Sequence, residues 1–389
     1  MKVKQVYELV NLATSEILGD ELVLQEDLSN VVDVGKEIID SDNLDNYVKK
    51  LVNHIGKVVF VNRVYQGGAP SVLMDGWEYG SILEKVSSEL PKATESDSWK
   101  LQDGVEYSPD IFYQPEVSVK FFNSKVTFEI PLSFTEKQIK ESFSNATQLN
   151  GFLSMLYTSV ENSMTVKLDA LIMRTINNMI GETLASGTAV QKVNLLAEYN
   201  GSTGESLTVD DALQSPEFIR YATYTIGLYS DRMSRISKLF NAGNAERFTP
   251  HDMQKIVLLS DFAKASETFL LSNTFNEERV LLPRHETIPY FQGSGETYSF
   301  EDVSKISVKT SGDVEIEQTG LIGVIFDRDA LGVANLDRRV TTNYNPKAEF
   351  YTNFYKFDAG FFNDLNENFV VFYIEDEGEG GEGGGGVEG

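Results

Sequence analysis

Cysteine is absent from the 389 residues of the sequence, and histidine is rare. Without cysteine the chain forms no disulfide, uses no thiol nucleophile and holds no cysteine-ligated zinc or iron–sulfur cluster. The three histidines, His54, His251 and His285, lack the short spacing that aims two imidazoles at one metal. A GxSxG nucleophile elbow and a phosphate loop with its lysine are missing too. We therefore predict neither metal nor cofactor.

Basic residues are also few, with 33 lysines and arginines against 59 acidic residues and a formal charge of −26. Such a chain repels nucleic acid and anionic lipid at long range, so sequence-specific DNA binding is not predicted. No stretch approaches the roughly 18 uninterrupted apolar residues of a membrane span. The first residues, "MKVKQVYELVNLATSEIL", are interrupted by Glu8, Asn11 and Glu16 and do not form an export signal. The 41% hydrophobic content nevertheless suffices for a folded core.

Asp327 and Asp329 are the best candidates for acid–base or cation chemistry, because alternate residues of a strand share one face. An acidic, carboxylate-dependent hydrolase that uses this pair is one alternative. The simpler interpretation, which we favour, is that the pair ends a strand and that Asp329 caps the following segment, "ALGV". No constellation of nucleophile, base and stabilising group emerges, so we predict that the protein is not an enzyme.

The amino-terminal third of the sequence changes character at residue 57. Residues 1–56 contain two amphipathic stretches that need a surface to pack on, which favours an arm over an independent domain. Residues 57–134 show the alternation of strands, with a hairpin predicted over 117–130 that turns at Asn123 and Ser124.

An irregular excursion interrupts these strands from residue 67 to residue 115. It mixes isolated apolar residues, both tryptophans, prolines and acidic turns, with one short amphipathic helix predicted near Gly80 to Val86. Almost fifty irregular residues are unusual inside a compact domain, so this segment favours contact with another molecule.

A long helix is predicted over residues 149–183, in a region that we place at 135–188. Apolar residues recur three and four apart through about nine turns and form one continuous stripe. A helix of this length predicts a spine on which other elements lie.

The carboxyl-terminal half begins with mixed helix and strand signals over residues 189–305. Ser215 is a predicted N-cap and Pro216 fits the first helical position. Strand patterns return over 306–374, and residues 375–389, rich in glycine and glutamate, predict a tail that buries no core.

This order of segments resembles tailed-bacteriophage major capsid proteins of the Hong Kong ninety-seven fold. The stretches that carry the resemblance are "DGWEYGSILEKV", "GLIGVIFDRDALGV" and "RRVTTNYNPKAEFYTNFYKFDA", and it covers nearly the whole chain. It implies an α+β fold with an N-terminal arm, an extended loop, a spine helix, a peripheral domain and an axial domain. The implied bounds are 1–56 for the arm, 57–134 for the loop strands, 135–188 for the spine, 189–305 for the axial domain and 306–374 for the returning peripheral strands.

The resemblance also implies a function and partners. The chain is expected to self-assemble through pentamers and hexamers into an icosahedral head shell around double-stranded DNA, in the virion, after assembly in the host cytoplasm. A separate scaffolding protein, a portal and decoration proteins are the expected partners. A phage-derived nanocompartment that encloses cargo enzymes is the alternative with the same fold. No isopeptide cross-link is predicted.

Candidate subunit contacts are aromatic residues and the rare cations, because such side chains dominate the energy of protein interfaces. An aromatic face for a ligand such as a sugar is an alternative for the stretch from 338 to 374. Arg338, Arg339 and Lys347 are expected to pair with acidic residues of a neighbouring subunit. The candidate set is Trp77, Tyr79, Trp99, Arg338, Arg339, Tyr344, Lys347, Tyr351 and Tyr355.

Overall fold

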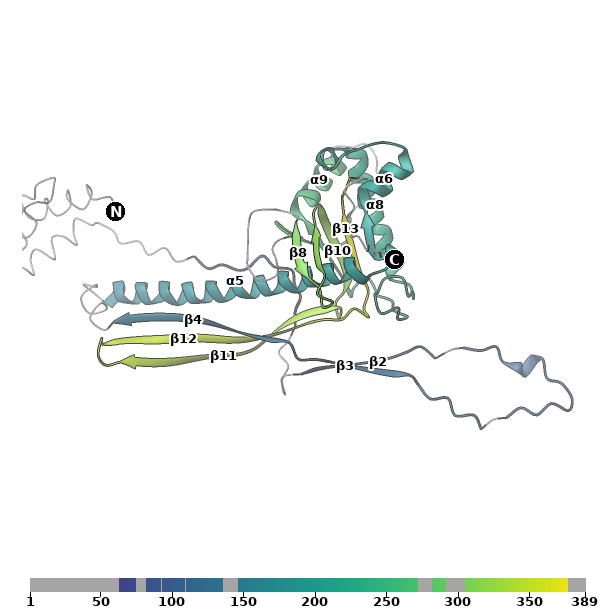
Figure 1. Ribbon diagram of the computed structural model, residues 1–389, viewed down its shortest axis with the longest axis horizontal. Helices are drawn as coiled ribbons and strands as arrows, with labels where there is room; N and C mark the ends of the chain where they lie inside the picture. Colours follow the sequence, from purple (N-terminus) through teal and green to yellow (C-terminus); the bar gives the residue numbers. More distant parts are fainter. Residues whose placement is uncertain are drawn as a thin grey trace, which may run out of the picture. The chain divides into compact units, whose positions relative to one another are not determined.

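A computed structural model describes most of the chain from residue 63 onward (Figure 1). The described residues are 63–74, 82–91, 93–108, 110–135, 146–271, 282–291 and 305–376. The predicted arm, Trp77 and Tyr79 lie outside them, as does the predicted tail from residue 377 onward. The chain divides into two units, Met1–Arg63 with Lys137–Ser159 and Val64–Glu136 with Val160–Gly389. All the sheets of the described residues belong to the second unit.

A five-stranded sheet forms the centre of this second unit. Its spatial order is β5, β13, β10, β6, β7, in which β10 runs antiparallel to both of its neighbours. All seven residues of β10 are buried, as expected of a central strand covered on both faces. The strand bounds are Lys192–Asn194 for β5, Gln254–Leu259 for β6, Glu286–Ile288 for β7, Leu321–Asp327 for β10 and Phe369–Tyr373 for β13.

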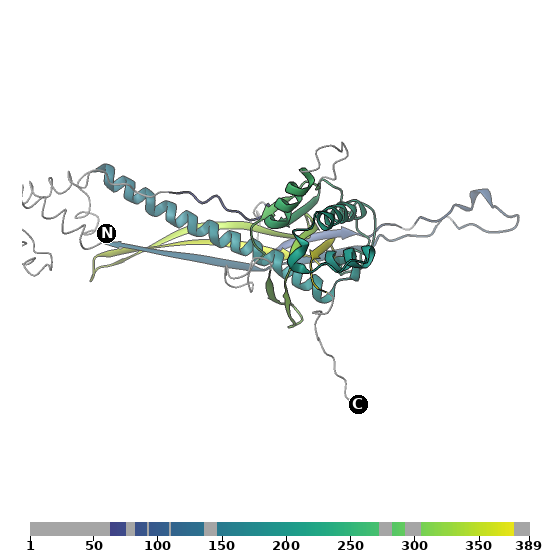
Figure 2. The same ribbon diagram turned by 90° about the horizontal axis from the view of Figure 1, so that it is seen from above.

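The two faces of this sheet supply two hydrophobic cores. Along β13, Phe369 and Val371 belong to the core that α5 shares, whereas Val370 and Phe372 belong to the core of the shorter helices. This alternation follows from the period of two in a strand. The ribbons of α8 and α9 lie beside this sheet in both views (Figures 1 and 2). The helices are α5 (Ala146–Ser186), α6 (Leu195–Thr203), α7 (Val209–Ala212), α8 (Pro216–Met233) and α9 (Ser260–Leu271).

The predicted long helix is confirmed as α5, which has 41 residues and therefore a length of roughly 60 Å. Its predicted apolar stripe is buried at Val160, Met164, Leu171, Ile172, Ile176, Met179 and Ile180. The predicted cap of α8 is confirmed as well, since the Ser215 side chain accepts a hydrogen bond from the Phe218 N–H at 3.3 Å and Pro216 opens the helix. No helix in the described part of the chain is long and apolar enough to cross a membrane.

A second sheet has four strands in the order β1, β11, β12, β4. Apolar side chains of β4, including Phe128 and Ile130, pack against the core that contains α5. Phe128 also meets Phe357 of β12 with ring centroids 4.9 Å apart. The strand bounds are Leu73–Met74 for β1, Lys125–Thr135 for β4, Leu331–Asn345 for β11 and Phe350–Asn363 for β12.

The predicted hairpin over residues 117–130 is wrong in its pairing. Its two strands exist as β3 (Val117–Phe122) and β4, but β3 pairs with β2 (Leu83–Ser88) and β4 pairs with β12. A two-residue hairpin turn needs positive φ, and the positive-φ residues of the described chain do not include Asn123 or Ser124. The strands therefore diverge at this point into two different sheets.

The helix predicted near Gly80 to Val86 is also wrong from residue 83 onward. The segment LEKVSS forms β2, whose side chains alternate between half-buried and exposed, because its backbone hydrogen bonds are made with β3. The remaining described elements are the hairpin β8 (Ile306–Lys309) with β9 (Glu315–Gln318) and the 3₁₀ turns η1 (Asp97–Trp99) and η2 (Ala189–Gln191).

The central sheet draws strands from two of the segments that the sequence separates. Strands β5, β6 and β7 come from residues 189–305, whereas β10 and β13 come from residues 306–374. The returning strands therefore complete the sheet that carries α6, α8 and α9, in addition to forming β11 and β12 of the other sheet.

Candidate functional site

The loop between β2 and β3, here called the hairpin loop and defined as residues 89–116, has almost none of its surface buried. Every described residue from 88 to 119 is exposed. Trp99 is 95% exposed, Phe112 85% and Tyr113 81%. Further exposed apolar side chains in the loop are Leu90, Leu101, Val105, Tyr107 and Ile111. So much exposed apolar surface in one segment marks a site of protein contact.

Local hydrogen bonds give the hairpin loop some structure of its own. The Ser96 side chain accepts from the Ser98 N–H at 3.3 Å and begins the turn η1, which ends at Trp99. The Gln102 N–H donates to the Tyr107 hydroxyl at 3.1 Å. The loop is also acidic, with seven aspartates and glutamates against two lysines and thus a net charge of −5. A cationic or polar partner surface suits it electrostatically.

The base of the hairpin is fixed by one buried carboxylate. Lys85 of β2 and Lys120 of β3 stand opposite each other in register. Lys85 Nζ donates to Asp364 Oδ2 at 2.9 Å, and Lys120 Nζ donates to Asp364 Oδ1 at 2.6 Å. The Asp364 side chain is only 2% exposed. Each of its two oxygens thus accepts from one lysine, and its negative charge offsets part of the repulsion between the two lysines across the strands.

A second carboxylate, Glu367, extends this contact. Lys85 Nζ also donates to Glu367 Oε1 at 2.7 Å and to the Asp329 carbonyl at 3.1 Å. Arg247 lies 3.5 Å from the same Glu367 oxygen and donates to the Ser87 hydroxyl of β2 at 3.2 Å. We call Lys85, Lys120, Arg247, Asp364 and Glu367 the anchor cluster. It ties the hairpin to the turn between β12 and β13, which connects the four-stranded sheet to the five-stranded one.

Burial and hydrogen bonding compete in the anchor cluster. Burial raises the pKa of Asp364, but hydrogen bonds from Lys120 and Lys85 outweigh it, so the pKa lies below that of an ordinary aspartate. Burial lowers the pKa of Lys85, and its hydrogen bonds to Glu367 and Asp364 more than restore it, so this pKa is raised. Burial raises the pKa of Glu367, and the hydrogen bond from Lys85 offsets this increase only in part. Asp364 is therefore the firmly ionised member.

The predicted cations in the middle of β11 already have partners in their own chain. Arg338 Nη1 lies 3.3 Å from Glu161 Oε2 of α5. Arg339 donates from Nη2 to Asp358 Oδ1 at 3.3 Å and also contacts Asp337. All of these contacts involve exposed or half-exposed side chains. The expected pairing of these arginines with acidic residues of a neighbouring subunit stays a prediction.

The predicted aromatic residues fall into different places. Trp99 lies at the end of η1 in the hairpin loop. Tyr344 and Tyr351 are paired across β11 and β12 with ring centroids 4.7 Å apart, and Tyr344 remains exposed. Tyr355 is partly buried and packs on the α5 core. Lys347 is exposed in the turn between β11 and β12, where its N–H donates to the Asn345 side chain.

The structure thus brings Tyr344 and Tyr351 together, places Lys347 in the turn that joins their strands, and keeps Trp99 in a separate segment. The residues of the anchor cluster were not among the candidates. Lys85 shares the half-buried face of β2 with Leu83 and Ser87, but nothing in the sequence links it to Asp364, which lies 279 positions away.

Asp327 and Asp329 do not form a catalytic pair. Asp327 is buried and accepts from the Thr249 hydroxyl at 2.7 Å and from the Asp329 N–H at 2.8 Å. Its carboxylate therefore closes the turn between β10 and β11. The expected cap by Asp329 is wrong, because the following residues form strand β11 and not a helix. Among the described residues, no three acidic or histidine side chains gather as a metal site.

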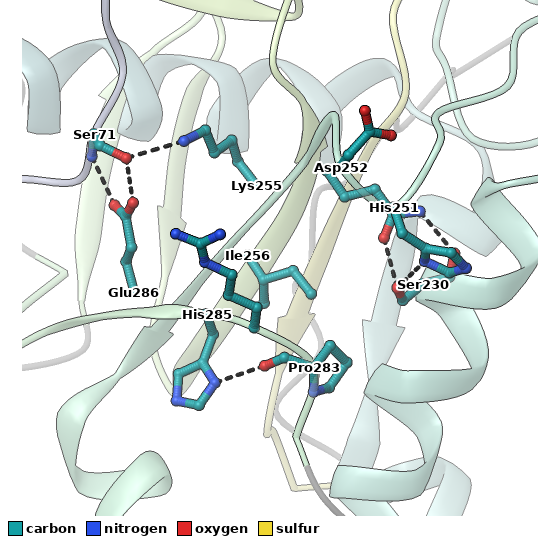
Figure 3. Close-up of a pocket in the computed structure, with 11 residues that line it drawn as sticks. Ser71, Ser230, His251, Asp252, Lys255, Ile256, Pro283, His285 and Glu286 are labelled. Carbon is teal, nitrogen blue, oxygen red and sulfur yellow. Dashed lines mark hydrogen bonds between the residues drawn. The ribbon is translucent and has the colours of Figure 1, made fainter.

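A pocket of about 570 Å³ lies beside β6 and β7 (Figure 3). Ser71 contacts the Glu286 carboxylate and accepts from Lys255 Nζ at 3.0 Å. His285 contacts the Pro283 carbonyl at 2.8 Å, and His251 lies 3.3 Å from the Ser230 hydroxyl. These polar groups mostly satisfy one another, and their arrangement does not provide a nucleophile with an adjacent base.

Solved structures of phage capsids have the same fold. The chain resembles one in the capsid structure of Staphylococcus phage Andhra, with a TM-score of 0.54, 9% identity and coverage of 82% of this chain and 87% of that one. It also resembles a chain in the structure of the head fiber and inner core protein gp22 of bacteriophage P68, with a TM-score of 0.55, 10% identity and coverage of 82% and 88%. The predicted α+β capsid fold is thereby confirmed.

Sequence comparison agrees with the fold. The major capsid protein of Bacillus phage GA-1 is 24% identical over 166 residues, which is 42% of this chain and only about a third, 34%, of the GA-1 protein. The sequence profile of the Phi29-like phage major capsid proteins matches residues 10–373. Because that match takes in nearly all of the 389 residues, the chain belongs to the family of Phi29-like phage major capsid proteins.

Proposed function

We propose that the chain assembles with copies of itself, through pentamers and hexamers, into a closed icosahedral head shell around double-stranded DNA. The observation that carries the proposal is the exposed, aromatic hairpin loop of residues 89–116. The contact surfaces of a shell subunit are covered when subunits meet, and this loop presents a large apolar surface that the described part of the chain leaves uncovered.

The energetics of the loop suit repeated contacts. Fully burying one large apolar side chain contributes roughly 1.5–3 kcal/mol. Trp99, Phe112 and Tyr113 together would therefore supply several kcal/mol at each contact, before the cost of ordering the loop is subtracted. Heterologous contacts of this kind close into rings around symmetry axes, and rings of two sizes build a closed shell.

The charge of the chain suits the contents of such a shell. At −26, the subunit does not hold packaged DNA by non-specific attraction, so it encloses the polymer without binding a sequence. The family resemblance further supports a separate scaffolding protein, a portal and decoration proteins as partners, and assembly in the host cytoplasm before incorporation in the virion.

Replacing residues 90–115 by a short glycine and serine linker tests the proposal. The cut starts after β2 and ends before β3. It does not begin at residue 67, because residues 67–74 include the buried Val72 and must be kept to preserve the core. We expect purified subunits with an unchanged melting temperature that form no shells in electron micrographs. A matched control shortens the exposed β8–β9 turn at residues 311–313 and keeps assembly. Normal shells from the loop replacement would overturn the proposal.

A further inference from the structure

We infer that the anchor cluster fixes the direction in which the β2–β3 hairpin carries its loop, and so acts as the positioning element for subunit contact. The inference rests on the proposed function, because it concerns the same loop. It assigns to Lys85, Lys120 and Asp364 a role in assembly that is separate from the stability of the two cores.

The hairpin depends on few other contacts for its direction. Phe122 meets Phe362 of β12 with ring centroids 5.1 Å apart, and Arg247 reaches Ser87. Beyond residue 88 the described chain is exposed until residue 119. The described contacts that hold the hairpin therefore concentrate at its base, and three of the residues involved are the charged members Lys85, Lys120 and Asp364.

The turn that carries Asp364 is itself firmly held. The Asp364 N–H donates to the Ala330 carbonyl at 2.7 Å, and its Oδ1 accepts from the Asn366 N–H at 3.1 Å. The Leu365 carbonyl accepts from the Gly243 N–H at 3.1 Å. A carboxylate fixed by backbone hydrogen bonds is a rigid reference point. The two lysines transmit its position to both strands of the hairpin.

Leverage makes the base important. The loop has 28 residues, so half of it, fully extended, spans at most roughly 45–50 Å. A rotation of only about 10° at the base then moves the far end by as much as roughly 8 Å. Such a displacement exceeds the distance over which apolar side chains contact one another. Assembly with a unique geometry therefore requires a defined base.

Spin labels can measure this direction in single subunits, because the chain has no cysteine to compete for the label. One label is attached at Val117→Cys, at the loop end of β3, and the other at Ser202→Cys, at the end of α6. Both sites are exposed. Dipolar spectroscopy on unassembled full-length subunits then gives the distance distribution between hairpin and helix.

The test variants are Asp364→Asn and Lys120→Met. Neither variant leaves a buried charge without a partner. In Asp364→Asn, Lys85 keeps Glu367 and Lys120 is partly exposed, and in Lys120→Met, Asp364 keeps Lys85. We expect the width of the distance distribution to rise at least about twofold and the yield of regular shells to fall at least about tenfold. Lys120→Arg should restore both. The matched control, Lys309→Met, removes a lysine whose partner Asp313 is exposed in the other hairpin, and should change neither quantity.

An unchanged distance distribution in both test variants overturns the inference, whatever their assembly. A broadened distribution with normal shells overturns the claim that direction controls assembly. Because the distances are measured on unassembled subunits, they stand apart from the loop-replacement experiment. Shells formed without residues 90–115 would overturn the proposed function and leave the measured anchoring of the hairpin in place.

Discussion

Gly320 and Ile374 join the entry of β10 to the exit of β13, since the Ile374 N–H donates to the Gly320 carbonyl at 2.9 Å. Gly320 has a φ of +64°, and a Cβ placed on it would lie 2.0 Å from the Ile374 carbonyl oxygen. Only glycine meets both conditions without moving backbone.

We therefore expect Gly320→Ala to lower the free energy of unfolding by about 2 kcal/mol or more. Urea denaturation followed by circular dichroism measures the change. Gly201→Ala in α6 is the control, because no atom outside the adjoining residues and backbone of α6 lies within 4 Å of the added methyl group. It should leave stability unchanged or raise it by about 0.5–1 kcal/mol. Equal effects of the two substitutions would contradict this account.

The exposed aromatic residues of the hairpin loop should matter to assembly and not to folding. Replacing Trp99, Phe112 and Tyr113 together by serine removes apolar surface that the described residues leave uncovered. We expect the melting temperature of the subunit to stay within about 2 °C and the critical concentration for shell formation to rise at least about tenfold. Light scattering measures assembly. Tyr224→Ser, an exposed tyrosine on α8, is the control that should assemble normally.

Local patterns predicted the elements whose formation depends on near neighbours. The apolar residues spaced three and four apart from Val160 to Ile180 fit only a helix with one buried face, and α5 has that face. Ser215 and Pro216 begin α8 as expected, because a cap is decided within four residues.

Local patterns in the sequence could not predict which strands pair or which residues form the anchor cluster. The alternation over 117–130 gives two strands but does not say which strands they meet, and the true partner of β4 is more than two hundred residues away in β12. Asp364 likewise gains its role only when β2, β3 and the turn after β12 come together. Its sequence context, "FFNDLNENF", indicates a turn and nothing about two lysines.

Arg338 and Arg339 are predicted to act at a contact between subunits. Within the chain both arginines make exposed ion pairs, which contribute little to stability. Arg338→Glu with Arg339→Glu should therefore impair shell formation while the subunit still unfolds cooperatively. Sedimentation velocity separates shells from subunits. Lys264→Glu, which breaks an exposed pair with Glu267 in α9, should leave assembly intact. If the double variant assembles normally, these arginines make no essential subunit contact.

Acid should weaken the anchor cluster through Asp364. The pKa of Asp364 is lower in the folded chain than in the unfolded one, where an aspartate titrates near about 3.9. Its ionisation therefore adds stability that is fully present above that unfolded pKa and is lost as the pH falls through the folded pKa. Glu367 acts in the opposite sense, because its raised pKa means that folding favours its protonated form.

The difference in unfolding free energy between the native chain and Asp364→Asn should thus be largest near pH 6 and shrink below about pH 4. Urea titrations at pH 6, 4.5 and 3.5 measure it. Asp313→Asn, at an exposed pair with Lys309, should show a small difference at every pH. A difference for Asp364→Asn that stays constant across this range would mean that the charge on Asp364 contributes nothing to the anchor. Lys85 and Lys120 would then hold the hairpin by packing alone.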